Sequence, residues 1–476
     1  MAIKHVLPPP DRRAFGQSRR KQVRRQEQNR WRIEDRQTDP IDALAASSAG
    51  RVPALLEIKW QRMAASPFGF FRGAVSVMAA DLAVLPHTGI FAQLCGDAHV
   101  RNLGAFAAPD GRLVFDINDF DETIRGPFEW DVKRLATSII LAGREAGSKS
   151  ADCGEAAALF LKSYRRSMHA FARMTVMEVA HFQVHRLQRI APVSQVLRKA
   201  EQATPLYNAE RLLQDPPKGS GLKHRIFVEN KPLQYRITGA KAQAILDSLG
   251  PYRQSLLPER RHFFDLYRPI DVAFRVVGTG SVGLRDYIVY LEGNSAEDPL
   301  FLQIKEETFS AYAPYLGEIG EPQHQGQRVV QGQRAMQFLS DMLLGWTSIN
   351  NRQYLVRQLN DHKGSLAIED LKGEGLMQYA EICGELLARG HARSGDPVAF
   401  DGYIGTSDRL VEAVAGFAID YADQTEQDYK TFLRSRFAPK TAKKGPPAKA
   451  SGRRPKLKPG PAIKEAAPVA AAREKK

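Results

Sequence analysis

Residues 94–122 read LCGDAHVRNLGAFAAPDGRLVFDINDFDE, and their pattern of apolar runs and acidic residues predicts a pair of strands followed by acidic loops. One apolar run ends on Asp97. A second, after a Pro-Asp-Gly turn signal, ends on Asp116 and Asp119. We therefore predict two strands whose ends gather these carboxylates beside the amide of Asn102. Carboxylate and amide oxygens are hard ligands that suit Mg²⁺.

Such a cluster fits the chemistry of phosphoryl transfer. A phosphoryl donor carries several negative charges, so its site must bring metal ions close to them. The site also needs a carboxylate that orients the acceptor hydroxyl and takes its proton.

The pattern D-x-x-x-x-N, followed by a strand and a D-F-x triplet, resembles the catalytic and metal loops of aminoglycoside and choline kinases. The resemblance implies that Asp97 is the catalytic base and that Asn102 and Asp119 hold the metal. GPFEWDVKRLA at 126–136 is similar to a further kinase motif. Asp131 in this motif lies twelve residues after Asp119, and this spacing favours Asp119 as the main metal ligand. Asp116 remains a second candidate ligand.

Three longer motifs resemble an uncharacterised bacterial family, domain of unknown function 2252 (DUF2252). They are RMAASPFGFFRG at 62–73, LCGDAHVRNLGAF at 94–106 and FDINDFDE at 115–122. The resemblance runs from about residue 52 to about residue 432. The family name supplies no activity, so the chemistry has to be argued from the residues.

A glycine-rich stretch, GTGSVG at 278–283, lies between strand-like runs at 274–277 and 287–291, and a third run at 300–304 leads into Lys305. Strand, glycine loop and strand is the kinase arrangement, in which backbone N–H groups cover the phosphates. A tight β-turn is the alternative. The resemblance implies that ATP phosphates are held by Gly278, Gly280, Ser281, Gly283 and Lys305.

In kinases the glycine loop precedes the catalytic loop, whereas here it follows about 180 residues later. We therefore predict an α+β, two-lobed protein kinase-like fold that is circularly permuted, with disordered basic termini. A helix at 70–82 would precede the catalytic strand. The predicted divisions are a mostly disordered arm (1–50), a helical lobe with the catalytic and metal loops (51–265), a β-rich nucleotide-binding lobe (266–362), C-terminal helices (363–438) and a disordered Lys/Pro/Ala-rich tail (439–476).

One kinase feature is missing from the sequence. The helix after the lysine strand should carry a glutamate that pairs with the lysine, but the helix predicted at 326–343 offers only Gln331 near its middle. The possible substitutes are Glu306, Glu307, Glu318 and Glu321.

The net charge of +15 is concentrated at the ends of the chain. Residues 1–36 carry +7 and residues 440–476 carry +10, which leaves about −2 for the body. Basic ends attract nucleic acid or anionic surfaces without sequence preference, although they can also be solubilising tails. We find no membrane span and no secretory signal, and we expect three reduced cysteines in a cytoplasmic protein.

Three functions remain open. The first is an ATP- and Mg²⁺-dependent phosphotransferase with an unknown, small-molecule hydroxyl acceptor. The second is a metal-dependent phosphoesterase or nuclease whose ligands are Asp97, His99, Asn102, Asp116 and Asp119. The third, motivated by the missing helix glutamate, is a non-catalytic, pseudokinase-like binding module. Arg72 could be either a phosphate contact or a buried ion-pair partner.

Overall fold

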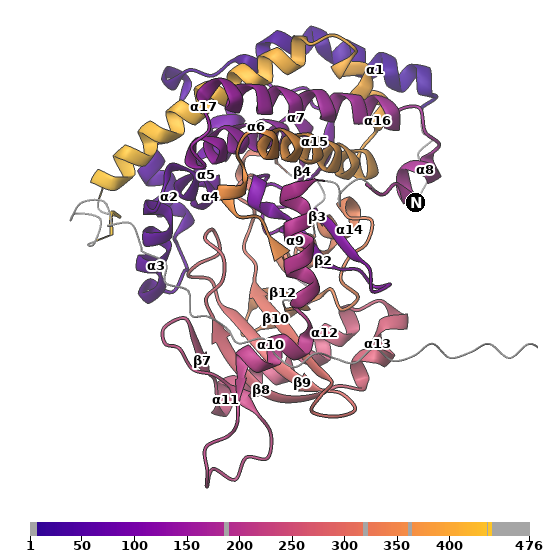
Figure 1. The fold of residues 1–476 in the computed structure, drawn as a ribbon. Helices are drawn as coiled ribbons and strands as arrows, with labels where there is room; N and C mark the ends of the chain where they lie inside the picture. Colours follow the sequence, from indigo (N-terminus) through magenta and orange to yellow (C-terminus); the bar gives the residue numbers. More distant parts are fainter. Residues whose placement is uncertain (1–6, 185–189, 318–321, 360–363, 436, 440–476) are drawn as a thin grey trace, which may run out of the picture.

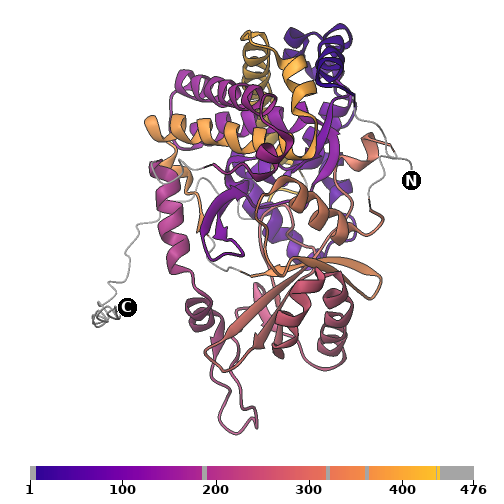
Figure 2. The ribbon, with the colours of Figure 1, turned by 90° about the vertical axis from the view of Figure 1, so that its right-hand side faces the viewer.

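The computed structural model describes residues 7–184, 190–317, 322–359, 364–435 and 437–439. Figure 1 shows a helical part at the top of the view and an antiparallel sheet with its own helices below. Figure 2, a quarter turn away, shows the same division. The protein is therefore a mixed helix and strand structure, as predicted.

Four long helices form the framework of the helical part: α6 (Phe128–Glu145), α7 (Ser150–Phe171), α15 (Glu374–Ser394) and α17 (Arg409–Arg434). Their apolar faces share one large core. Because α15 packs along α7 and α17 along α6, distant parts of the chain build one body. Around them lie α2 (Pro40–Ser47), α3 (Pro53–Ala64), α4 (Pro67–Gly73), α5 (Val75–Ala83), α8 (Val176–His181), α9 (Ala191–Gln202), α14 (Gln325–Met336) and α16 (Pro397–Ile404).

The main sheet has six antiparallel strands in the order β11-β12-β10-β9-β8-β7. They are β7 (Gln234–Arg236), β8 (Arg268–Arg275), β9 (Asp286–Glu292), β10 (Pro299–Glu306), β11 (Gly345–Ile349) and β12 (Arg352–Gln358). Every residue of β9 and β10 is buried, as expected for central strands. Beside the sheet lie α10 (Pro205–Leu212), α11 (Gly239–Asp247), α12 (Leu249–Ser255) and α13 (Pro258–Asp265).

Small sheets carry the acidic loops. β1 (Phe91–Leu94) pairs with β4 (Ile124–Pro127), and β2 (Leu103–Ala107) forms a hairpin with β3 (Leu113–Ile117). β13 (Gly364–Ser365) adds to the edge of β2. The strands predicted around residues 94 and 115 are therefore present, and the turn between β2 and β3 contains Gly111 at φ +80°. A further short pair joins β5 (Leu213–Gln214) and β6 (Ile226–Phe227).

The described part of the N-terminal arm is folded, which corrects the prediction of a mostly disordered segment. Residues 9–22 form helix α1 (Pro9–Gln22), which packs against α16, and α2 follows after short 3₁₀ turns. Composition misses this because the arm is anchored by ion pairs to distant residues. Arg36 bonds both Asp81 and Asp428, and all three side chains are buried.

Two further boundaries differ from the prediction. The helix expected at 70–82 is two helices, because the chain turns at Ala74 between α4 and α5. The β-rich body begins before residue 266, since apolar residues of α11, α12 and α13 share a core with the sheet. The sequence around 239–265 has helical periodicity, which predicts helices but does not show that they pack against the sheet.

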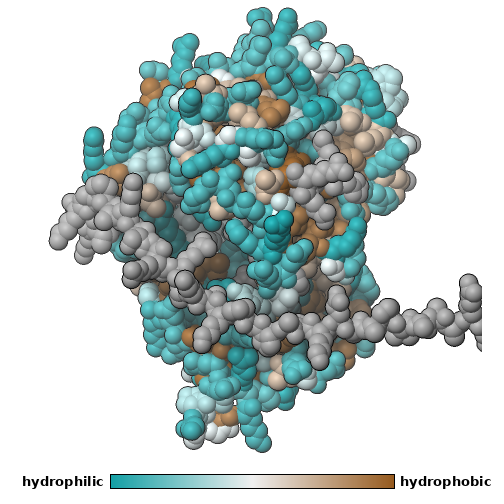
Figure 3. Space-filling view, viewed as in Figure 1, coloured by the Kyte–Doolittle hydropathy of each residue, from teal (hydrophilic) through white to brown (hydrophobic). Residues whose placement is uncertain are grey.

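The predicted disordered tail, from residue 440 onward, lies outside the described residues. No helix in the described ranges is long and apolar enough to cross a membrane. All three cysteines are free and buried. The face shown in Figure 3 is mainly hydrophilic.

Candidate functional site

The two acidic loops and the glycine-rich stretch meet at one cavity of about 610 Å³, which we name the acidic cavity. Helices α2, α3 and α4 contribute to one wall, and the loop between β8 and β9 contributes to another. Six of the predicted site residues are among those that line it: Asp97, Asn102, Asp119, Gly278, Gly280 and Ser281.

The loop that carries Asp97 is held by a buried carboxylate below it. Asp131, on the first turn of α6, accepts hydrogen bonds from the backbone N–H groups of Cys95 (2.8 Å) and Gly96 (3.0 Å). Gly96 has φ +83°, and a side chain there would collide with the carbonyl of Glu122. Asp131 therefore positions the loop that carries Asp97.

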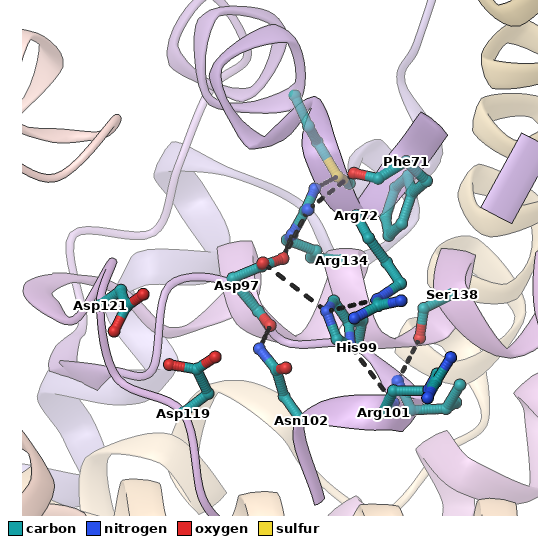
Figure 4. Close-up of polar contacts among 12 residues, drawn as sticks. Phe71, Arg72, Asp97, His99, Arg101, Asn102, Asp119, Asp121, Arg134 and Ser138 are labelled. Carbon is teal, nitrogen blue, oxygen red and sulfur yellow. Dashed lines mark hydrogen bonds and ion pairs between the residues drawn. The ribbon is translucent and has the colours of Figure 1, made fainter. Parts of the chain in front are cut away.

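Asp97 has one carboxylate oxygen fixed and the other less constrained. Arg134 donates to Oδ1 from Nε (2.8 Å) and Nη2 (2.6 Å), while Oδ2 lies 3.7 Å from Nε2 of His99 (Figure 4). Burial raises the pKa of Asp97 above its ordinary value, although Arg134 opposes the shift. A carboxylate with a raised pKa is suited to accept a proton.

Asn102 is locked by its neighbour in the same loop. Its Nδ2 donates to the backbone carbonyl of Asp97 at 2.6 Å, and the residue is buried. In Figure 4, Asn102 lies below Asp97 and to the right of Asp119.

Lys305 extends from β10 to the second acidic loop. Its Nζ forms an ion pair with Asp121 and lies 3.9 Å from Oδ1 of Asp119. Burial alone would lower the pKa of Lys305, but Asp119 and Asp121 raise it. The lysine-bearing strand and the acidic loops, separated by about 180 residues, are therefore in contact.

Three buried acidic oxygens at this site accept no hydrogen bond from the part of the chain that the structure describes. They are Oδ1 of Asp119, Oδ1 of Asp121 and Oε1 of Glu307. Burial opposes ionisation of Asp119, yet Lys305 and Arg357 lower its pKa below the ordinary value. Buried oxygens without donors are where a cation would be stabilised.

Asp116 is not at the cavity. It is buried on β3 and pairs with Arg389 of α15, whose Nη2 lies 2.5 Å from Oδ1 and 2.6 Å from Oδ2. The candidate ligand Asp116 is therefore replaced at the site by Asp119 and Asp121, which follow the end of the strand. Side chains alternate across a strand, so Asp116 faces the helix.

The glycine-rich stretch is tied to α3 and to the residues before it. Nη1 of Arg51 donates to the carbonyls of Gly280 (2.8 Å) and Val282 (2.6 Å), and Arg62 donates to that of Gly278. Gly283 does not line the cavity. Its φ is +96°, and its carbonyl accepts from the N–H of Val52 at 2.7 Å.

No described residue of α14 fills the role of the helix glutamate. Arg328 of α14 instead donates to backbone carbonyls of the acidic loop, including Asp121 at 2.9 Å. Glu306 pairs with Arg285 and Arg352, whereas Glu307 lines the cavity. The other two substitutes, Glu318 and Glu321, lie outside the described residues. Asp121 is the carboxylate that pairs with Lys305.

Three cations that line the cavity form no ion pair with a carboxylate among the described residues: Arg51, Lys59 and Arg72. Lys59 is 1% exposed, and burial, then Arg51, lowers the pKa of its ammonium. Burial also lowers the pKa of Arg72, to about 10. Sequence reasoning missed Lys59 because it lies inside an ordinary helical pattern.

Within the described ranges, no three His, Cys, Asp or Glu side chains are grouped so as to hold a metal ion by themselves. A metal held here would need Asn102, Asp119 and ligand oxygens from a bound molecule. The partnerless oxygens of the acidic loop fit such an ion.

Fold and cavity together define the class: a mixed helix and strand protein with an acidic, lysine-bearing cavity where its helices meet an antiparallel sheet. The chain belongs to DUF2252, described as an uncharacterized protein conserved in bacteria, whose family model matches residues 51–435. No curated protein and no solved structure matches the chain.

Proposed function

We propose that the protein is an ATP- and Mg²⁺-dependent phosphotransferase with a kinase-like site whose halves occur in swapped order along the chain. The contact of Lys305 with Asp119 and Asp121, next to a cavity that also contains Asp97, carries the proposal. A small-molecule hydroxyl is the acceptor class that the kinase resemblance implies.

The strand order supports the kinase-like reading. β8, β9 and β10 are neighbours in the sheet, with the glycine loop between the first two and Lys305 on the third. This is the order of strand, glycine loop, strand and lysine strand in a nucleotide-binding lobe. The acidic loops precede this unit in the sequence, so a circular permutation accounts for the arrangement.

Each residue then has a role in holding the donor. Lys305 and the backbone N–H groups of the glycine loop bind the phosphates. Asn102 and Asp119 hold Mg²⁺, which neutralises negative charge on the phosphoryl group. Lys59 lines the same cavity, is buried and forms no ion pair with a carboxylate among the described residues, so a bound phosphate would stabilise its charged form.

Asp97 accepts the proton of the acceptor hydroxyl through Oδ2, while Arg134 keeps Oδ1 in place. As the hydroxyl oxygen bonds to the terminal phosphorus, the bond from that phosphorus to the bridging oxygen breaks. The transferred group ends on the acceptor and ADP leaves. Raising the pKa of Asp97 by burial strengthens it as a base.

The alternatives have less support. A phosphoesterase built on five ligands would include Asp116, which instead pairs with Arg389. A binding module without turnover is favoured by one observation, the use of Asp121 in place of a helix glutamate. Measuring ADP release separates the two functions, because a phosphotransferase releases ADP and a binding module without turnover does not.

A thermal-shift titration with ATP and Mg²⁺ tests the proposal. At a free ligand concentration of a hundred times Kd, the wild type is expected to gain about 2.7 kcal/mol of stability. In Asp119→Ala the Mg²⁺-dependent part should be lost. Asp110→Ala, in the exposed hairpin turn, is the matched control and should respond like wild type. If no nucleotide shifts the wild type with Mg²⁺, the proposal is wrong.

Lys59→Met should separate ligand binding from stability. Removing a buried ammonium that no carboxylate compensates should raise the melting temperature of the free protein. The same change should weaken ATP binding by about tenfold, because one charge-assisted contact is lost. Melting curves and calorimetric titration measure the two effects. A variant with lower stability and unchanged affinity would show that Lys59 is structural.

A further inference from the structure

A second cavity, of about 490 Å³, shares no lining residue with the acidic cavity. It lies where α1 meets α16 and the start of α17, at the top of Figure 1. We name it the arginine cavity, because its charged walls comprise Arg13, Arg20, Arg25, Arg173, Arg409 and His169, with the single carboxylate of Asp401.

The positive charge in this cavity is not balanced. Asp401 already accepts from Arg13 and from Nδ1 of His169, the latter at 2.8 Å. The remaining arginines form no ion pair within the part of the chain that the structure describes: Arg20, Arg25, Arg173 and Arg409. Four guanidinium groups therefore line one cavity without an ion pair to any described carboxylate.

Arg20 and Arg25 each use only part of their hydrogen-bonding capacity. Nε of Arg20 donates to the carbonyl of Tyr403, and Nη1 of Arg25 donates to that of Ile404, both at 2.9 Å. These contacts cap the last turn of α16. A guanidinium has five N–H donors, so donors remain for a ligand.

The guanidinium groups of Arg20 and Arg25 both lie close to Gly405. A Cβ placed on Gly405, whose φ is +67°, would lie 2.7 Å from Nη2 of Arg20 and 2.7 Å from Nη1 of Arg25. Burial lowers the pKa of Arg25, and Arg20 and Arg409 lower it further. Like charges held this close destabilise the protein unless an anion offsets them.

We propose that the arginine cavity binds a small anion with two or more linked phosphate groups. Planar guanidinium forks match phosphate oxygens in pairs, and the hydroxyls of Thr406 and Ser407 add donors. No Phe, Tyr or Trp is among the residues that line it, so it lacks the stacking platforms that proteins use for single-stranded nucleic acid. The ligand is recognised by its phosphates.

The N-terminal arm contributes residues to both cavities and so connects them. α1 contributes to the arginine cavity, while residues of α2 in the same arm line the acidic cavity. A ligand that requires α1 to be docked stabilises the docked arm, and with it one wall of the acidic cavity.

Calorimetric titration of inorganic triphosphate into the full chain tests this inference. EDTA is present and ionic strength is fixed, so binding does not depend on Mg²⁺ in the acidic cavity and the outcome is independent of the proposed function. Arg173→Gln/Arg409→Gln, which changes two exposed rim residues, should lose at least about tenfold in affinity with an unchanged melting temperature. Arg25→Gln should also lose affinity.

The control is Arg32→Gln/Arg198→Gln, which removes the same charge from exposed positions elsewhere and should bind within about twofold of wild type. Equal losses in both double variants would overturn the proposal, since net charge would then explain binding. So would orthophosphate binding as tightly as triphosphate. Tighter binding of a single-stranded DNA oligonucleotide, lost in the same rim variant, would identify a nucleic-acid surface instead.

Discussion

Asp97→Asn is expected to lower the turnover number by about 10²–10⁴-fold, the usual contribution of a positioned general base. Asparagine keeps the shape of the side chain and an acceptor for Arg134, but it cannot take the proton of an acceptor hydroxyl. ATP affinity should change little, because Asp97 contacts the reacting hydroxyl rather than the phosphates. ADP release with water as the acceptor measures the effect while the natural acceptor is unidentified.

The matched control is Asp116→Asn, since both aspartates pair with a buried arginine and only Asp97 lines the acidic cavity. This control should lose stability and keep its turnover number once folded. If the two variants lose turnover equally at temperatures where both are folded, Asp97 acts through stability and the proposed base is wrong.

Arg389→Met is expected to destabilise the protein by about 3–5 kcal/mol, because it leaves the carboxylate of Asp116 buried without its partner. Both side chains are 5% exposed, so solvent cannot replace the lost ion pair. Urea denaturation measures the change as a lower midpoint at unchanged slope.

Two companion variants make the result specific. Arg112→Met breaks an exposed pair with Asp110 and should have little effect. Arg389→Met combined with Asp116→Leu should recover much of the loss, because no uncompensated charge remains. If Arg389→Met is no worse than Arg112→Met, the buried pair does not have the structural role assigned to it.

Local pattern predicted the elements that carry the chemistry. The apolar runs before Asp97 and Asp116 are β1 and β3, and the run that ends at Lys305 is β10. Strand signals succeeded there because each strand is buried and bounded by glycine or polar residues. The helical divisions predicted at 51–265 and 363–438 likewise contain the four long helices α6, α7, α15 and α17.

Long-range partners could not be predicted. Composition suggested a disordered arm, whereas in the structure Arg36 of this arm forms ion pairs with Asp81 and Asp428, which are distant in the sequence. Nothing in the sequence shows that Asp121, rather than a helix glutamate, pairs with Lys305. Such contacts join residues far apart in the chain, and neither propensity nor spacing encodes them.

Choosing between Asp116 and Asp119 depended on one physical fact. Asp116 is inside β3 and pairs with Arg389 of α15, whereas Asp119 follows the strand end and lines the acidic cavity. Motif spacing favoured the same residue. Neither strand position nor motif spacing pointed to Lys59. A single lysine in an amphipathic helix is usually solvated, so its burial could not be predicted.

The central claim is that a nucleotide binds with its phosphates between the lysine-bearing strand and the acidic loops. An acyl-phosphate derivative of ATP, which transfers its acyl group to lysines near the bound phosphates, tests this directly when labelled peptides are mapped by mass spectrometry. We predict labelling of Lys59 or Lys305 that excess ATP with Mg²⁺ prevents. Lys59 is expected to be the better nucleophile because burial, and then Arg51, lowers the pKa of its ammonium. Labelling spread over exposed lysines, with neither residue protected by ATP, would contradict the claim.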